Sequence, residues 1–174
     1  TKDFIASRGE YFSAKILAKY IGWTFIDAKD LVRFDDKGNF LSGETNAYAR
    51  GRLLNVKNIV IPGCYGSTST GEIKTVSRGG SDITGAIVAR ATYSTMYENW
   101  TDVSGFLICD PRIVPLAKPI RQITYKELRE LSYMGATVLH EDAIFPIRKE
   151  GIPINIRNTN APDDRGTLIV EATC

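Results

Sequence analysis

The spacing of apolar residues along the chain predicts helices that alternate with strands. Helical spacing extends over residues 8–20, 46–54, 81–95 and 125–134, with a further short helix expected over 143–149. Short apolar runs predict strands over residues 23–26, 59–61, 152–156 and 167–170, and strand segments joined by loops within 100–112. Such alternation indicates an α/β domain with a largely parallel sheet.

Local signals refine this outline. Gly22 is placed to end the first helix in a left-handed conformation. The aromatic residues Phe12, Tyr20 and Trp23 are expected in the core, and the run at 59–61 is expected to be a fully buried parallel strand. The segment 66–71 is rich in glycine, serine and threonine and is expected to be an exposed, flexible loop.

The segment 77–82 reads Ser-Arg-Gly-Gly-Ser-Asp and precedes an alanine-rich helical stretch. Two glycines allow backbone N–H groups to approach a ligand, and the N-terminus of the following helix favours an anion. Arg78 adds a guanidinium that can bind a carboxylate in a bidentate manner. We expect Ser81 or Asp82 to cap the helix. Taken alone, the segment could also be an ordinary glycine turn before a capped helix.

Composition limits the possible functions. The 174 residues, 43% of them apolar, suffice for one domain with a sizeable core. A net charge of +2 with mixed signs argues against a dedicated nucleic-acid partner and leaves small charged metabolites as candidates. No apolar run is long enough to span a bilayer, so no membrane partner is expected.

The reactive residue types exclude several chemistries. Three cysteines, Cys64, Cys109 and Cys174, lack the spacing of a zinc site or a disulfide framework, which favours a reducing cytoplasm. A single histidine, His140, leaves little material for histidine-based hydrolases. Gly66 and the glycine five residues later are not followed by the lysine of a P-loop.

Eight short segments carry a family resemblance in the same order along the chain. They are Ser-Arg-Gly-Glu at 7–10, Ile-Pro-Gly at 61–63, Ser-Arg-Gly-Gly-Ser-Asp at 77–82, Trp-Thr-Asp-Val-Ser-Gly at 100–105, Cys-Asp-Pro-Arg at 109–112, Met-Gly-Ala at 134–136, Val-Leu-His at 138–140 and Gly-Thr-Leu at 166–168. Together they resemble the aspartate kinases of the amino-acid kinase superfamily. The first and third segments in combination are specific to the aspartate kinases.

The resemblance implies an α/β fold, a three-layer αβα sandwich with a mainly parallel central sheet, here incomplete. Residues 1–174 are then one partial catalytic domain, holding the substrate-binding part and a nucleotide-binding portion, with no second domain. The implied reaction is ATP-dependent phosphorylation of the β-carboxylate of L-aspartate to aspartyl phosphate, the first step toward lysine, threonine and methionine, in the cytoplasm. Mg²⁺ would arrive with the ATP.

The resemblance also assigns roles to individual residues. Asp82 matches the catalytic aspartate, which we expect to orient a catalytic lysine from outside this chain. The substrate-binding positions are Glu10, Arg78, Gly79, Gly80 and Ser81, and the nucleotide-binding positions are Thr101, Asp102, Leu107, Arg112 and Thr137. The family often has an aromatic residue at Leu107 and a lysine at Thr137.

We expect the chain to be a fragment that lacks an N-terminal Lys-Phe-Gly-Gly segment and C-terminal ACT domains and is inactive by itself. The full-length enzyme is expected to be a homo-oligomer. Alternatives that share the nucleotide half are glutamate 5-kinase, acetylglutamate kinase and uridylate kinase. A non-catalytic ligand-binding module is a further alternative.

Overall fold

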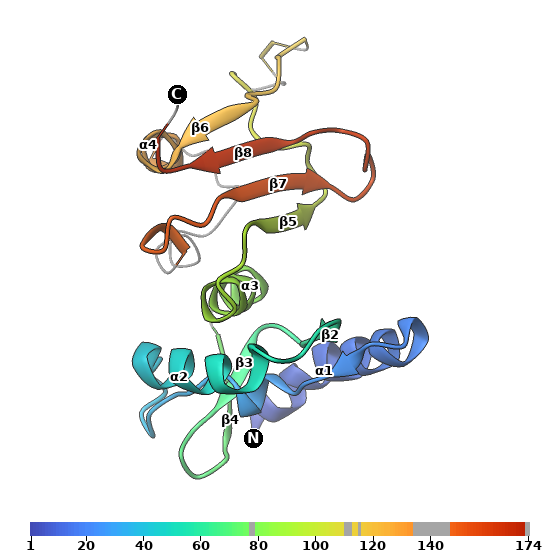
Figure 1. Ribbon diagram of the computed structural model, residues 1–174, viewed down its shortest axis with the longest axis vertical. Coiled ribbons are helices and arrows are strands. Elements are labelled where there is room, and N and C mark those ends of the chain that lie inside the picture. The colour runs from blue at the N-terminus through green and yellow to red at the C-terminus, as the bar shows by residue number, and fades with distance from the viewer. Residues whose placement is uncertain (77–78, 110–112, 115, 134–146, 173–174) are drawn as a thin grey trace. The chain divides into compact units, whose positions relative to one another are not determined.

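A computed structural model of the protein describes residues 1–76, 79–109, 113–114, 116–133 and 147–172 (Figure 1). The chain divides into two compact units, Thr1–Tyr93 and Ser94–Cys174. Whether residues 1–174 act as one partial catalytic domain stays a prediction.

Helices and short strands alternate in the first unit. Its elements are α1 (Lys2–Ile21), β1 (Thr24–Phe25), the 3₁₀ helix η1 (Ala28–Asp30), α2 (Ser42–Leu53), β2 (Ile59–Val60), β3 (Tyr65–Ser67), β4 (Ile73–Thr75) and α3 (Gly80–Ala91). Strands β1 and β2 pair in parallel, and β3 and β4 form an antiparallel hairpin. A core cluster lies between α2 and α3 and contains Leu31, Val32, Phe34, Ala49, Leu53, Ile87 and Ala91.

The second unit is built on a four-stranded sheet. Its elements are β5 (Tyr97–Thr101), β6 (Gln122–Thr124), α4 (Tyr125–Tyr133), β7 (Ile154–Asn158) and β8 (Thr167–Val170). The strand order is β5-β7-β8-β6, with parallel pairs at β5–β7 and β6–β8 and an antiparallel pair at β7–β8, as Figure 1 shows. The predicted α/β class is confirmed, and the helix expected over 143–149 falls largely outside the described residues.

Helix α1 differs from its prediction in length and in its buried face. It begins at Lys2, six residues before the predicted start, and ends as expected at Gly22, whose φ is 73°. Its buried residues are small, with Ala14 and Ala18 among them, whereas Phe12 and Tyr20 are 57% and 88% exposed. The prediction that Phe12, Tyr20 and Trp23 lie in the core is therefore wrong. Helix α1 packs through small side chains that permit close approach, and Trp23, which follows the helix, is 46% exposed.

The segment predicted as an exposed loop at 66–71 is exposed only in its second half. Ser67 and Thr68 are 3% and 1% exposed and belong to a buried hairpin arm, whereas residues 69–71 are exposed as predicted. A Cβ atom on Gly66 would lie 2.7 Å from the Cβ of Val32. Glycine is thus required here for close packing rather than for flexibility. The run at 59–61 does join a parallel pair, but its residues are half-buried.

Candidate functional site

The N-terminus of α3 carries the predicted anion-binding turn. Gly79 is the N-cap and adopts a left-handed conformation with φ 58°, and Gly80 is the first helical residue. Ser81 and Asp82 lie inside the first turn, so the prediction that one of them caps the helix is wrong. No side chain caps this end of the helix, because a glycine N-cap has none to offer. The helix ends at Ala91, four residues before its predicted end.

This turn packs backbone against backbone on the segment that leads into β3. A Cβ atom on Gly80 would lie 2.7 Å from the Cα of Cys64, and one on Gly63 would lie 3.0 Å from the Cα of Ser81. The Cys64 thiol lies 3.2 Å from the Ser81 hydroxyl. Such close approach needs glycine on both sides, and it holds the first turn of α3 in one place.

The first turn combines the features that favour an anion. Its first N–H groups have no partner within the helix and carry the positive end of the helix dipole. Ser81 is exposed and Asp82 is half-buried. Arg78 lies outside the described residues, so its position relative to this turn stays a prediction.

Glu10 lies on the exposed surface of α1. Within the described ranges, no hydrogen bond or ion pair includes Glu10. An exposed carboxylate of this kind is accessible to the ammonium group of a ligand. The predicted convergence of Glu10 with Arg78 stays a prediction, because it depends on a residue outside those ranges.

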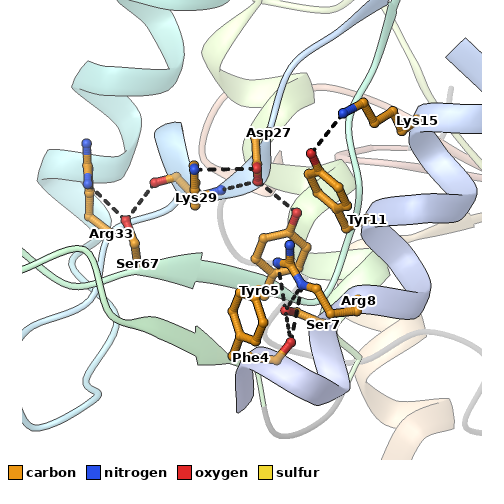
Figure 2. A network of polar contacts seen from close by, with 10 residues as sticks. All are labelled: Phe4, Ser7, Arg8, Tyr11, Lys15, Asp27, Lys29, Arg33, Tyr65 and Ser67. Atoms are coloured by element: carbon orange, nitrogen blue, oxygen red, sulfur yellow. Dashed lines mark hydrogen bonds and ion pairs between the residues drawn. The ribbon is translucent and has the colours of Figure 1, made fainter. Parts of the chain in front are cut away.

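A polar network around the buried Tyr65, beside α1, was not foreseen from the sequence (Figure 2). The Tyr65 hydroxyl donates to the Asp27 carboxylate at 2.7 Å, and Asp27 also accepts the Lys29 backbone N–H at 3.1 Å. The Arg8 guanidinium lies 5.6 Å from the centre of the Tyr65 ring and 4.5 Å from that of Tyr11. The network joins β3 to α1 two residues before Glu10.

The phenol of Tyr65 is held in its neutral form. Burial is the main cause that raises its pKa above the ordinary value, and the hydrogen bond to Asp27 and the negative charge of that carboxylate raise it further. Tyr65 is fully buried. The residue therefore acts as a permanent hydrogen-bond donor at neutral pH.

The predicted nucleotide-binding residues that the structure describes belong to the second unit. Thr101 ends β5, and its hydroxyl donates to the exposed Asp102 carboxylate at 3.2 Å. The Thr101 carbonyl accepts the Thr159 backbone N–H at 2.8 Å, which fixes the end of the strand. Leu107 is half-buried and forms an isolated antiparallel bridge with Pro119. Two further predicted positions, Arg112 and Thr137, lie outside the described residues.

The described residues offer neither a membrane-spanning helix nor a cluster of metal ligands. Among the helices of the described ranges, none has the length and apolar character needed to cross a membrane. In the same residues, no three histidine, cysteine or carboxylate side chains gather where they could hold a metal ion.

Comparison with known proteins identifies the family of the chain. The sequence profile of the amino acid kinase family matches residues 1–158. The chain belongs to the amino acid kinase family. Within that family it is similar to aspartokinase 3 of Bacillus subtilis, with 37% identity over 97% of this chain and 39% of the relative.

Solved structures of amino acid kinases agree with the fold. The chain matches Clostridium acetobutylicum aspartate kinase with 56% identity and a TM-score of 0.93, over 98% of this chain and 39% of that one. It matches Escherichia coli aspartokinase III in complex with aspartate and ADP with 30% identity and a TM-score of 0.89, over 99% of this chain and 41% of that one. UMP kinase from Ureaplasma parvum, at 14% identity and a TM-score of 0.61, shares the fold.

These matches confirm the predicted resemblance to aspartate kinases and the predicted fold. The chain spans between 39% and 41% of the length of the three aspartate kinases named above. The roles assigned to individual site residues stay predictions.

Proposed function

We propose that the natural gene product that carries this chain phosphorylates the β-carboxylate of L-aspartate with ATP. The observation that carries the proposal is the match to an aspartate kinase with 56% identity over 98% of the chain. The uridylate kinase alternative is supported only at the level of the fold, since those structures are 14–16% identical.

The chemistry suits the residues present. A carboxylate acceptor with a pKa of about 4 is already ionised at neutral pH, so attack on the γ-phosphorus requires no general base. Catalysis then depends on holding two anionic reactants in line and on neutralising their charge.

The N-terminus of α3 is the proposed amino-acid site. The N–H groups of Gly80 and Ser81, together with the Arg78 guanidinium, would bind the carboxylates of aspartate. Glu10 would bind its ammonium group. Asp82 would hold a catalytic lysine in place, since its own negative charge opposes direct contact with the attacking carboxylate.

The second unit would bind the nucleotide through Thr101, Asp102, Leu107, Arg112 and Thr137. The use of a nucleotide is supported by the relative solved in complex with ADP. Magnesium is proposed to enter on the phosphates of ATP. We further propose that the gene product forms a homo-oligomer and acts in the cytoplasm.

An acceptor-comparison assay tests the proposal. The gene product is mixed with ATP and one of four acceptors: L-aspartate, L-glutamate, N-acetyl-L-glutamate or UMP. ADP release is followed by a coupled assay, and the acyl phosphate is trapped with hydroxylamine. We expect both signals with L-aspartate. Turnover with another acceptor and none with L-aspartate would reject the assignment, and titration calorimetry that detects ligand binding without turnover would favour a non-catalytic module.

Replacement of Arg78 by lysine tests the amino-acid site directly. A lysine keeps the charge but loses the bidentate geometry, so the affinity for aspartate should fall far more than the affinity for ATP. The matched control is Arg52→Lys, at an exposed position in the last turn of α2, which should change neither. Equal losses of both affinities in Arg78→Lys would contradict the proposed role.

A further inference from the structure

Thr84 links the first turn of α3 to a segment twenty residues earlier. Thr84 is buried, with 6% of its surface exposed. The hydroxyl donates to the Gly80 carbonyl at 2.7 Å, and its oxygen accepts the Cys64 backbone N–H at 3.3 Å. A threonine hydroxyl inside a helix commonly bonds to the carbonyl four residues before it, but here it also receives a hydrogen bond from outside the helix.

The backbone of Cys64 is held in an uncommon conformation. Its φ is 72°, in the left-handed region that side-chain-bearing residues rarely adopt. Its carbonyl accepts the Val76 N–H at 2.8 Å, and its N–H donates to Thr84. Such a conformation persists only where the surroundings fix it on several sides, and Thr84 supplies one of these constraints.

Close packing makes the position of the turn depend on this hydrogen bond. Gly80 approaches Cys64 so closely that a Cβ atom would lie 2.7 Å from the Cα of Cys64. A change in the backbone of Cys64 must therefore be transmitted to Gly80. Ser81 follows directly, with its hydroxyl 3.2 Å from the Cys64 thiol.

We propose that Thr84 is a positioning residue for the amino-acid site, which acts by setting the orientation of the Gly80 and Ser81 N–H groups. The inference rests on the proposed function, because these N–H groups bind the substrate only if the first turn of α3 is the aspartate site. Thr84 does not itself contact substrate. Its effect on substrate arises because a hydrogen bond to an anion weakens steeply when its geometry changes.

Three variants of the natural gene product separate positioning from simple stability. Thr84→Val keeps the shape and removes the hydroxyl, and Thr84→Ser keeps the hydroxyl. Thr92→Val is the matched control, because the Thr92 hydroxyl donates to the Val88 carbonyl at 2.8 Å near the other end of the same helix. The KM values for aspartate and ATP, kcat and the melting temperature are measured for each variant.

We expect Thr84→Val to raise the KM for aspartate by about tenfold, the size of effect that one lost hydrogen bond produces, while the KM for ATP stays within about twofold. Thr84→Ser should restore the KM for aspartate, and Thr92→Val should leave it unchanged even if the melting temperature falls. The proposal is overturned if Thr84→Val leaves the KM for aspartate unchanged. It is also overturned if Thr92→Val raises the KM for aspartate as much as Thr84→Val does.

A measurement on the wild type covers the case in which Thr84→Val does not fold. Aspartate should slow hydrogen exchange of the Cys64 amide, whose hydrogen bond ends on Thr84, by at least about fivefold. The Val56 amide, which donates to the Leu53 carbonyl after α2, serves as the reference. Unchanged exchange at Cys64 in a protein that phosphorylates aspartate refutes the role of Thr84. Wild-type protein that neither binds nor phosphorylates aspartate refutes the proposed function instead.

Discussion

Replacement of Tyr65 by phenylalanine removes one hydroxyl from the centre of the first unit and leaves the ring in place. In the wild type this hydroxyl donates to the Asp27 carboxylate at 2.7 Å, and Tyr65 is fully buried. The side chain of Asp27 is only 12% exposed. In the variant, Oδ1 of Asp27 keeps only the hydrogen bond from the Lys29 backbone N–H, while the Lys29 ammonium lies 4.0 Å from Oδ2.

The magnitude follows from the nature of the lost bond. A hydrogen bond to a charged group contributes about 1.5–3 kcal/mol, and the partner left without it adds part of its desolvation cost. We expect the free energy of unfolding of the variant to fall by about 2 kcal/mol. For a chain of this length, that corresponds to a melting temperature lower by about 4–8 °C.

Urea denaturation followed by circular dichroism measures this loss, with Tyr20→Phe as the matched control. Tyr20 is 88% exposed, so its hydroxyl stays hydrated and its removal should not change the midpoint. The slope of the free energy against urea should be equal in all three proteins, which shows that the midpoint alone has changed. Unfolding of Tyr65→Phe and Tyr20→Phe at the same urea concentration as the wild type would contradict a stabilising role of the Tyr65–Asp27 hydrogen bond.

Two more predictions follow from backbone packing and from the buried phenols. Gly80→Ala should destabilise the protein by about 1–3 kcal/mol, because the new Cβ would press on Cys64. Gly51→Ala, within α2 and with open space around it, should instead stabilise the protein by about 0.5–1 kcal/mol. Denaturation midpoints of the two variants that move in the same direction would contradict this prediction. The pKa of Tyr65 and that of Tyr125 are both raised in the folded state, mainly by burial, so stability is full below about pH 10 and falls above it by about 1.4 kcal/mol per pH unit for each phenol. Unfolding measured between pH 9 and pH 11 should show a shallower fall when either tyrosine is replaced by phenylalanine.

The spacing of apolar residues predicts where most helices and strands lie, but not which of their side chains are buried. The helix at 125–133 and the strand at 167–170 lie where the sequence predicts them. Helix α2 begins at Ser42, four residues early, because its N-terminus has no capping side chain that a sequence could reveal. In α1, Ala14 is buried and Phe12 is exposed, although a large aromatic residue is usually the one placed in the core. The face of α1 that contacts the neighbouring strands consists of small residues.

The candidate site was predictable only where its residues are contiguous. A glycine pair before a helical stretch identified the turn at Gly79 and Gly80, because backbone conformation there is a local property. The contributions of Asp27, Tyr65 and Thr84 were not foreseen, since each depends on contacts made across 20 to 38 residues of sequence. No local pattern distinguishes a tertiary contact of this kind from an ordinary tyrosine or threonine.

The proposed acceptor, a carboxylate, is suited to the backbone N–H groups of the proposed amino-acid site. A carboxylate that is already ionised needs no base, so discrimination and rate depend on how firmly the N–H groups are held. Close contacts between Gly63 and Ser81, and between Gly80 and Cys64, fix those groups without immobilising long side chains, whose ordering is entropically costly. A site with such close backbone contacts is sensitive to the addition of even one methyl group to a glycine. If the first turn of α3 is the aspartate site, as we propose, a single methyl group at Gly80 should weaken aspartate binding more than the loss of a whole exposed side chain such as that of Arg52.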